Sequence, residues 1–73
     1  MYNEYDTFIL AEPLTDTTIP VGTRGVVLMV LGGVPPSYEV EFPDGKGGNL
    51  GNDVSYTISA RYMRPDGQTT SKE

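Results

Sequence analysis

The sequence predicts a small all-β fold built from antiparallel strands. In residues 37–42, Ser-Tyr-Glu-Val-Glu-Phe, polar and apolar side chains alternate. This is the pattern of a strand with one buried face, because successive side chains point to opposite faces. Residues 25–31 form an apolar run rich in β-branched side chains, and Gly-Gly-Val-Pro-Pro separates the two segments. Since that composition is typical of a turn, the two segments are expected to form a β-hairpin.

One strand and one long connection are expected before this hairpin. Residues 6–10, Asp-Thr-Phe-Ile-Leu, read as the first strand. Residues 11–23 contain two prolines and a polar cluster, and proline does not suit a central strand because it removes a ladder donor. We therefore expect a loop there, followed by the second strand at about residues 24–31 and the third at about residues 37–42.

Two further strands are expected after the hairpin. Residues 43–53 are too rich in glycine to form a regular element. Residues 54–59 resume the alternation and predict a fourth strand. A single 3₁₀ turn fits residues 60–62, and residues 63–64 read as a short closing strand. One face of the fourth strand is expected to carry Val54, Tyr56 and Ile58, and the other Ser55, Thr57 and Ser59.

These elements form one domain over residues 1–67, and the polar residues 68–73 are expected to be a disordered tail. Five short strands, a long loop after the first and a tight turn before the last predict an SH3-like barrel. Closure of such a barrel also protects the strand edges. An OB-like barrel is the alternative, but it usually has a helix between its third and fourth strands, and residues 43–53 offer none.

A family resemblance rests on four segments, which read FILAEPL, PVGTRGVVLMV, PPSYEVEFPDG and YTISARYMRP. Together they resemble an uncharacterised family of short bacterial proteins, distantly similar to the barrel of the nitrile hydratase β subunit. The resemblance covers residues 6 to about 65, and its sharpest part is the YEVEF segment. It implies an SH3-like barrel and no assigned activity. The glycine-rich loop at 43–53 departs from the family pattern.

The amino-acid composition narrows the chemistry that this chain can perform. It contains no Cys and no His, so disulfides and thiolate or imidazole zinc sites are excluded. The commonest general base and the strongest nucleophile are also missing, and we expect no enzyme. The longest apolar run is too short for a membrane helix, and no signal peptide is recognised. We therefore expect a cytoplasmic protein without a membrane partner.

The charge is acidic, with ten carboxylates against five basic residues, and residues 1–23 contain no Lys or Arg. Nucleic-acid binding depends on clustered cations, so we expect no nucleic-acid partner. A KOW-like reading of Gly22-x-x-Gly25 stays open as a second alternative function, although a tight turn explains both glycines. A basic protein partner is compatible with this charge, and so is simple solubility.

Two groups of oxygen-bearing side chains are candidates for a chemical site. Glu39 and Glu41 share one strand face, whereas paired acid catalysis needs a cleft between the carboxylates. Four oxygen donors on the glycine-rich loop suit calcium, but the spacing matches no known calcium loop and ordinary turn chemistry explains them. No metal or cofactor is therefore expected. The four loop donors are Asp44, Asn49, Asn52 and Asp53.

The remaining candidate is a protein-interaction surface. Residues 26–31 are apolar on both faces, although one small barrel buries only its inner face. Either the set 26/28/30 or the set 27/29/31 is expected outside, unless the 11–23 loop or the N-terminus covers it. The tyrosines add side chains that are enriched at interfaces. The residues expected to bind a partner, on the outer face of the second and third strands and on the 11–23 loop, are Leu14, Asp16, Val27, Met29, Tyr38, Glu39 and Glu41.

The expected function is therefore that of a non-catalytic protein-interaction module. Its small size and acidic charge suit an antitoxin or immunity-type inhibitor that binds a protein partner. The alternative is an accessory subunit or module of a larger enzyme, which the nitrile hydratase resemblance implies. Self-association is left open, because the surplus apolar face could be covered by a second copy.

Overall fold

The computed structural model describes residues 1–15, 17–51 and 54–67, and in this part of the chain the fold is all-β, as predicted. Residue 16 and the predicted tail at 68–73 lie outside the described residues. The strands, with the 3₁₀ helix that precedes the last one, are β1 (Thr7–Leu10), β2 (Arg24–Gly32), β3 (Ser37–Glu41), β4 (Tyr56–Ser59), η1 (Ala60–Tyr62) and β5 (Met63–Pro65).

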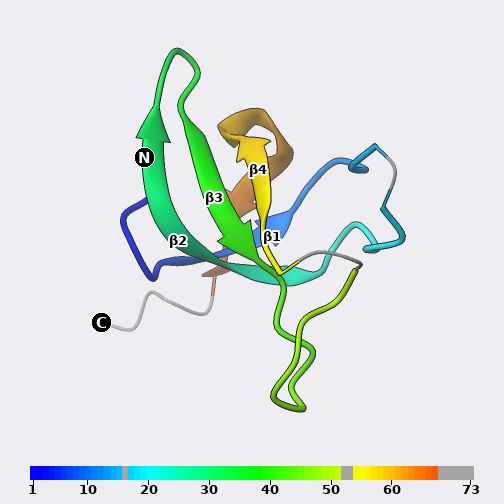
Figure 1. Cartoon of the computed structure of the whole chain (residues 1–73). Coiled ribbons are helices and arrows are strands. Elements are labelled where there is room, and N and C mark those ends of the chain that lie inside the picture. Colours follow the sequence, from blue (N-terminus) through cyan, green and yellow to red (C-terminus); the bar gives the residue numbers. More distant parts are fainter. Residues whose placement is uncertain (16, 52–53, 68–73) are drawn as a thin grey trace.

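Five antiparallel strands of the described chain form one sheet in the order β4-β3-β2-β1-β5. The long strand β2 pairs with β1 near its start and with β3 along most of its length, so the predicted hairpin is confirmed. Figure 1 shows the strongly curved sheet, with the β2–β3 hairpin projecting from one end. The strand order and the 3₁₀ turn before β5 are compatible with an SH3-like barrel, which stays a prediction.

The alternation in β3 places one face of this strand in the core, as the sequence predicts. Tyr38, Val40 and Phe42 are completely buried, whereas Glu39 and Glu41 are only partly buried. The ring of Phe42 packs edge-on against Phe8, with 5.7 Å between the centroids. Buried side chains of this size contribute roughly 1.5–3 kcal/mol each through removal of apolar surface from water. The core consists of Phe8, Leu10, Ile19, Val27, Tyr38, Val40, Phe42, Ile58 and Met63.

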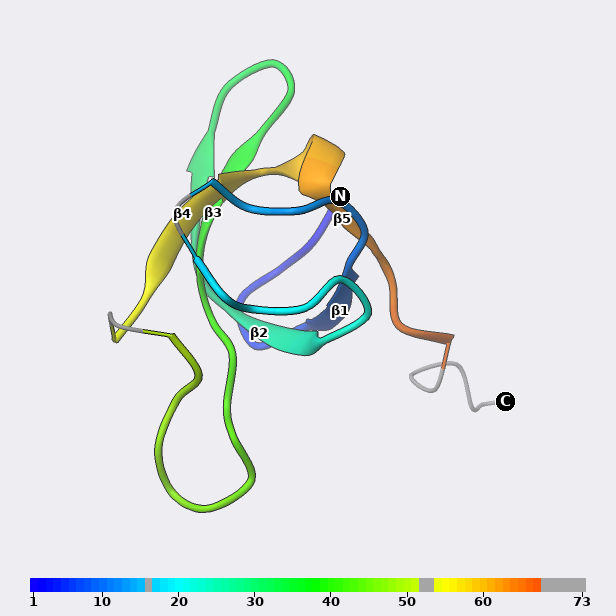
Figure 2. The ribbon, with the colours of Figure 1, turned by 90° about the vertical axis from the view of Figure 1, so that its right-hand side faces the viewer.

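Two irregular segments close the inner side of the curved sheet. The 11–23 loop crosses its open side (Figure 2), and Ile19 from this loop is buried in the core. At the N-terminus, the ring of Tyr2 packs edge-on against Tyr38, and the backbone N–H of Tyr2 donates a hydrogen bond of 3.1 Å to the Tyr38 hydroxyl. The loop and the N-terminus therefore cover the inner side of the sheet, whereas Met29, Val30 and Leu31 of the second strand stay exposed.

Strand β2 does not divide into the two expected sets of side chains. Its pairing with β3 shifts between Val27 and Met29 and again between Val30 and Gly32. Each shift adds one residue to β2, which bends the strand and changes the face of the residues that follow. The expectation that every second residue from 26 to 31 faces outward is therefore wrong.

The fourth strand is shorter than predicted. Pairing between β3 and β4 begins with Val40 opposite Tyr56 and includes Ile58 opposite Tyr38. Ile58 is buried, but Val54 is exposed. Val54 precedes the first residue pair of this ladder, so no neighbouring strand orients its side chain toward the core. The predicted strand start at Val54 is therefore wrong, because β4 begins at Tyr56.

Candidate protein-interaction surface

Two of the predicted partner-binding residues lie next to each other on the outer face of the sheet. Met29 of β2 is the register partner of Glu39 of β3, and Glu39 is opposite Thr57 of β4. Tyr38 and Val40 flank Glu39 in the strand and point into the core, so Glu39 points outward. Met29 is 52% exposed. One row of side chains therefore crosses three strands on the surface.

The carboxylate of Glu39 is fixed by two hydroxyl groups. Ser55 Oγ donates to one carboxylate oxygen, and Thr57 Oγ1 donates to Oε1 at 2.6 Å. Hydrogen bonds to a charged form stabilise it, so the hydroxyls of Ser55 and Thr57 lower the pKa of Glu39, against a weaker opposing effect of desolvation. Glu41 lies on the same face, opposite Val26. Met29 is thus adjacent to the carboxylate of Glu39, and Glu41 lies further along the same face.

Val27 and Tyr38 do not belong to this surface, although both were predicted there. Each is completely buried in the core. Val27 is opposite Val40 in the ladder and shares its inner face. The hydroxyl of Tyr38 accepts the backbone hydrogen bond from Tyr2, so its polar end is satisfied inside the protein. The prediction that Val27 and Tyr38 bind a partner is therefore wrong, because both side chains pack in the core.

The part of the predicted surface on the 11–23 loop lies elsewhere in the fold. Leu14 is partly buried and packs against the core. It lines a shallow pocket of about 240 Å³, together with residues of β4 and η1 that include Tyr56 and Tyr62. The structure does not bring Leu14 together with Met29 in this pocket. Asp16, also predicted for this surface, lies outside the described residues.

The most exposed apolar side chains of the hairpin were not all predicted. Leu31 is 48% exposed, Val30 is 38% exposed and Val34 is fully exposed. Val34 belongs to the turn between β2 and β3. Its position in the Gly-Gly-Val-Pro-Pro turn could have indicated from the sequence that this apolar side chain is exposed. We define the hairpin patch as Met29, Val30, Leu31 and Val34.

A second pocket, of about 480 Å³, lies beside the N-terminal segment. Its lining includes Tyr2, Tyr5 and Thr7. Burial raises the pKa of the Tyr2 hydroxyl, and the neighbouring Tyr38 and Asp6 add to this effect. No predicted site residue lines this pocket, so it is separate from the surface expected from the sequence.

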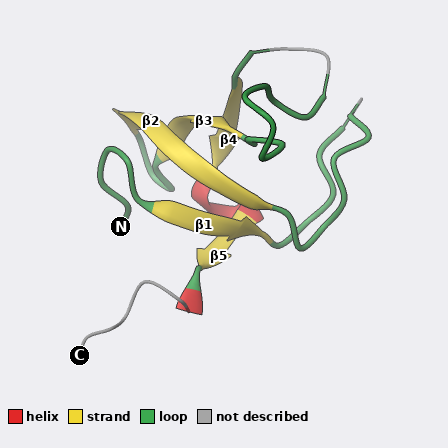
Figure 3. Cartoon of the chain, turned by 90° about the horizontal axis from the view of Figure 1, so that it is seen from below, coloured by secondary structure: helices red, strands yellow, loops and turns green. Residues whose placement is uncertain are grey.

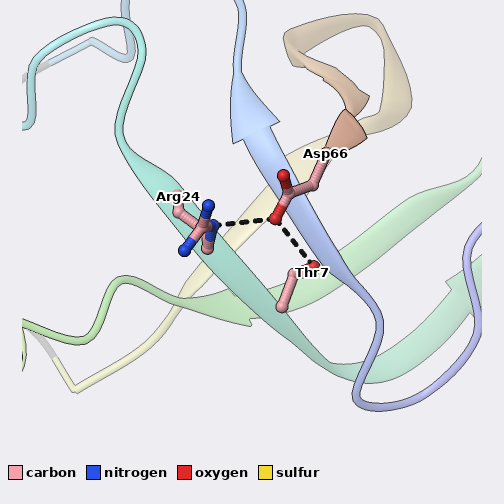
Figure 4. Close-up of polar contacts among 3 residues, drawn as sticks. All are labelled: Thr7, Arg24 and Asp66. Carbon is pink, nitrogen blue, oxygen red and sulfur yellow. Dashed lines mark hydrogen bonds and ion pairs between the residues drawn. The ribbon is translucent and has the colours of Figure 1, made fainter. Parts of the chain in front are cut away.

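Asp66 also lines this second pocket, and its contacts stabilise the fold. Its side chain is 5% exposed, and its Oδ2 lies 2.7 Å from Arg24 Nε. Thr7 Oγ1 donates a hydrogen bond of 3.0 Å to the same oxygen. Figure 4 shows these three side chains, which join β1, the start of β2 and the residue after β5.

The glycine-rich loop after β3 is organised by Asp44. Its Oδ1 accepts hydrogen bonds from the backbone N–H groups of Lys46, at 2.7 Å, and Gly48, at 3.1 Å. Among the described residues, no three acidic side chains lie close enough together to hold a metal ion. No helix in the described segments has the length and apolar character needed to cross a membrane.

Comparison of this chain with protein-family models, with curated proteins and with solved structures finds no match. The family resemblance stated from the sequence therefore stays a prediction.

Proposed function

We propose that this protein is a non-catalytic protein-interaction module that binds its partner through the hairpin patch. The observation that carries the proposal is the exposure of four apolar side chains on one projecting hairpin. Isolated apolar residues are common on surfaces, but neighbouring ones that project from the fold are typical of contact sites. Burial of this patch would add apolar contact area at an interface.

The charges around the patch bear on the kind of partner. Glu39 and Glu41 lie on the outer face of β3, and Glu39 is opposite Met29 of β2. The whole chain has a formal net charge of −5, so a basic protein surface would be attracted over longer distances. An antitoxin or immunity-type inhibitor acting in the cytoplasm is the specific form of this proposal. No observation on the described residues favours the accessory-module or KOW-like alternatives over it.

Site-directed photo-crosslinking tests the proposal. A photoreactive amino acid is placed at position 29 of the full chain, in the organism that encodes it, and crosslinked products are identified by mass spectrometry. The matched control places the same amino acid at position 54, since Val54 is also an exposed apolar residue but lies outside the hairpin. We expect a crosslinked protein from position 29 and none from position 54.

Each result of this experiment has a defined meaning. No product from position 29, or the same products from both positions, would contradict the interaction surface. If a captured enzyme loses activity when the chain binds, the inhibitor role is supported. If a captured catalytic subunit requires the chain for activity, the accessory-module alternative is favoured instead.

A further inference from the structure

The pocket of about 480 Å³ beside the N-terminal segment has both aromatic rings and carboxylates in its lining. In Figure 3 the segment before β1 loops back beside the start of this strand, and β5 lies along β1 on the side away from β2. The tyrosines, Tyr2 and Tyr5, and the carboxylates, Asp6 and Asp66, come from these parts of the chain. Because aromatic faces and carboxylates both attract cations, the lining suits a positively charged ligand.

One of these two carboxylates is left for a ligand. Asp66 is paired with Arg24. Asp6 is exposed, and its Oδ2 accepts a hydrogen bond of 2.8 Å from the backbone N–H of Asn3. Within residues 1–15, 17–51 and 54–67, no basic side chain pairs with Asp6. Since residues 1–23 also contain no Lys or Arg, the charge of Asp6 is available to a cation from outside this segment.

The ring of Tyr2 is held in place at this pocket by the core. It packs edge-on against Phe8, with 6.3 Å between the centroids, and against Tyr38, with 5.6 Å. Burial, Tyr38 and Asp6, in this order, raise the pKa of the Tyr2 hydroxyl, so the carboxylate of Asp6 is close enough to act on this tyrosine. A ring that is already fixed loses little conformational entropy when a ligand binds beside it.

Tyr5 lies at a backbone position that favours glycine. The N–H of Asp6 donates to the carbonyl of Asn3 at 3.1 Å and closes a turn, and within this turn Tyr5 has a φ of 69°. Residues other than glycine rarely adopt this conformation, because their Cβ crowds the backbone. The side chain of Tyr5 is 74% exposed, so core packing does not offset the strain. An exposed ring kept in a strained turn beside a pocket is typical of a binding site.

We propose that this pocket binds an arginine side chain of a basic protein partner. The planar guanidinium stacks on a tyrosine ring and donates hydrogen bonds to a carboxylate at the same time, whereas the ammonium of lysine is a compact and strongly hydrated charge. Tyr5 provides the exposed ring, and Asp6 provides the acceptor.

The proposal rests on the proposed function and names the chemistry of its partner. The N–H of Tyr5 donates to the carbonyl of Val27 at 2.6 Å, which fixes this tyrosine at the edge of β2. Strand β2 continues from Val27 into the hairpin patch. One basic partner that covers the hairpin patch is therefore able to reach the pocket as well, and the acidic net charge of −5 favours its approach.

NMR titration of the full, isotope-labelled chain with the tripeptide acetyl-Gly-Arg-Gly-amide tests the pocket. We expect saturable shifts of the backbone amide signals that are largest at residues 5–7 and 66. The matched probe carries citrulline in place of arginine, which has nearly the same shape without the charge, and it should give no saturable shift. The corresponding lysine peptide should bind more weakly than the arginine peptide. Equal binding of either control peptide, or no saturable shift at these residues, would overturn the proposal.

Removal of the Asp6 charge separates a local contact from the effect of net charge. Asp6→Asn should weaken binding of the arginine peptide by about two- to fivefold, which is the size expected for an exposed cation contact. Glu4→Gln is the matched control, because it removes one charge from the same segment at a residue that does not line the pocket. This variant should bind like the wild type, and equal weakening by both substitutions would overturn the contact with Asp6.

Tyr5→Gly separates a binding role of this ring from a structural one. The substitution relieves the unfavourable backbone conformation, so the melting temperature should stay at or above that of the wild type. Binding of the arginine peptide should nevertheless weaken by about two- to fivefold, because the exposed ring is lost. A variant that melts earlier, or that binds the peptide as tightly as the wild type, would overturn the assignment of Tyr5 to the site.

The failure of this proposal is distinguishable from failure of the proposed function. If position 29 crosslinks to a protein but the arginine peptide does not bind, the hairpin surface is supported and the arginine pocket is overturned. If the peptide binds but position 29 gives no product, the pocket is supported and the hairpin surface is contradicted. If both experiments succeed, an excess of the arginine peptide should reduce crosslinking from position 29, and the citrulline peptide should not.

Discussion

The ring of Phe8 fills the space in front of the Cα of Gly25. These two residues are opposite each other in the β1–β2 ladder, and a Cβ built on Gly25 would collide with the Phe8 ring and lie 3.0 Å from the carbonyl oxygen of Glu41. The backbone of β2 therefore approaches a core side chain at a position where only glycine fits.

Gly25→Ala should destabilise the protein by about 1–3 kcal/mol, because the added methyl group forces the Phe8 ring out of its packed position. Urea unfolding of both proteins measures the difference. Gly67→Ala is the matched control, since its added Cβ meets no atom within 4 Å, and it should change stability by less than about 0.5 kcal/mol. A Gly25→Ala variant as stable as the wild type would show that the Phe8 ring can move away from the added methyl group without loss of stability.

Asp66→Ala should lower the free energy of unfolding by about 1–3 kcal/mol, since it removes a buried acceptor and leaves the Thr7 hydroxyl without this partner. The loss is limited because Arg24 is 48% exposed and water can solvate its guanidinium. Thermal and urea unfolding check the result. Glu12→Ala removes an exposed carboxylate and should have little effect, so equal losses in both variants would point to net charge as the cause.

The stability that Glu39 contributes should depend on pH. Its folded-state pKa lies below the ordinary value of 4.5, so the contribution is complete above the unfolded-state pKa and is lost as the pH falls through the folded-state pKa. The difference in unfolding free energy between the wild type and Glu39→Gln should therefore shrink in acid. Unfolding titrations from about pH 7 to about pH 3 cover this range.

The hydroxyl donors provide the control for the Glu39 experiment. In a Ser55→Ala/Thr57→Val background, the effect of Glu39→Gln should vary much less with pH, because the hydrogen bonds that lower the pKa are absent. The claim that Ser55 and Thr57 lower the pKa of Glu39 would be contradicted if the difference in unfolding free energy grew toward acid. It would also be contradicted if the pH dependence of this difference stayed the same without both donors.

Tyr38→Phe should destabilise the protein by about 1 kcal/mol, since the Tyr2 backbone N–H loses its buried acceptor. Hydrogen exchange should show the strongest local effect at the N-terminal segment. Tyr62→Phe serves as the control, because the Tyr62 hydroxyl has no hydrogen bond to the described residues, and its stability should be close to that of the wild type. Equal effects of the two substitutions would mean that the Tyr38 hydroxyl does not anchor the N-terminus.

The local pattern of the sequence was sufficient to predict the all-β class and the hairpin. The alternation of residues 37–42 depends only on neighbouring positions, and it correctly indicates that Tyr38 and Val40 are buried. The same pattern argues against Tyr38 as a contact residue, because it places this side chain on the buried face of the strand. The 3₁₀ turn at Ala60–Tyr62 was also predicted from its length and position.

The exposed apolar residues could not be identified from this pattern. Their orientation depends on the two register shifts between β2 and β3, and a bulge is a property of the pairing of two strands. Val27 and Met29 belong to the same alternating set in the sequence, but the shift between them leaves one in the core and the other on the surface. Val54 shows the same limit, because alternation alone does not reveal where a ladder begins.

The loop organised by Asp44 carries an amine through which this protein can be attached to a solid support. Lys46, on this loop, is the lysine among the described residues. Figure 1 shows the loop and the β2–β3 hairpin projecting from opposite ends of the molecule. Coupling through the Lys46 amine therefore tethers the protein by its far end and leaves the hairpin accessible in a surface-based binding measurement.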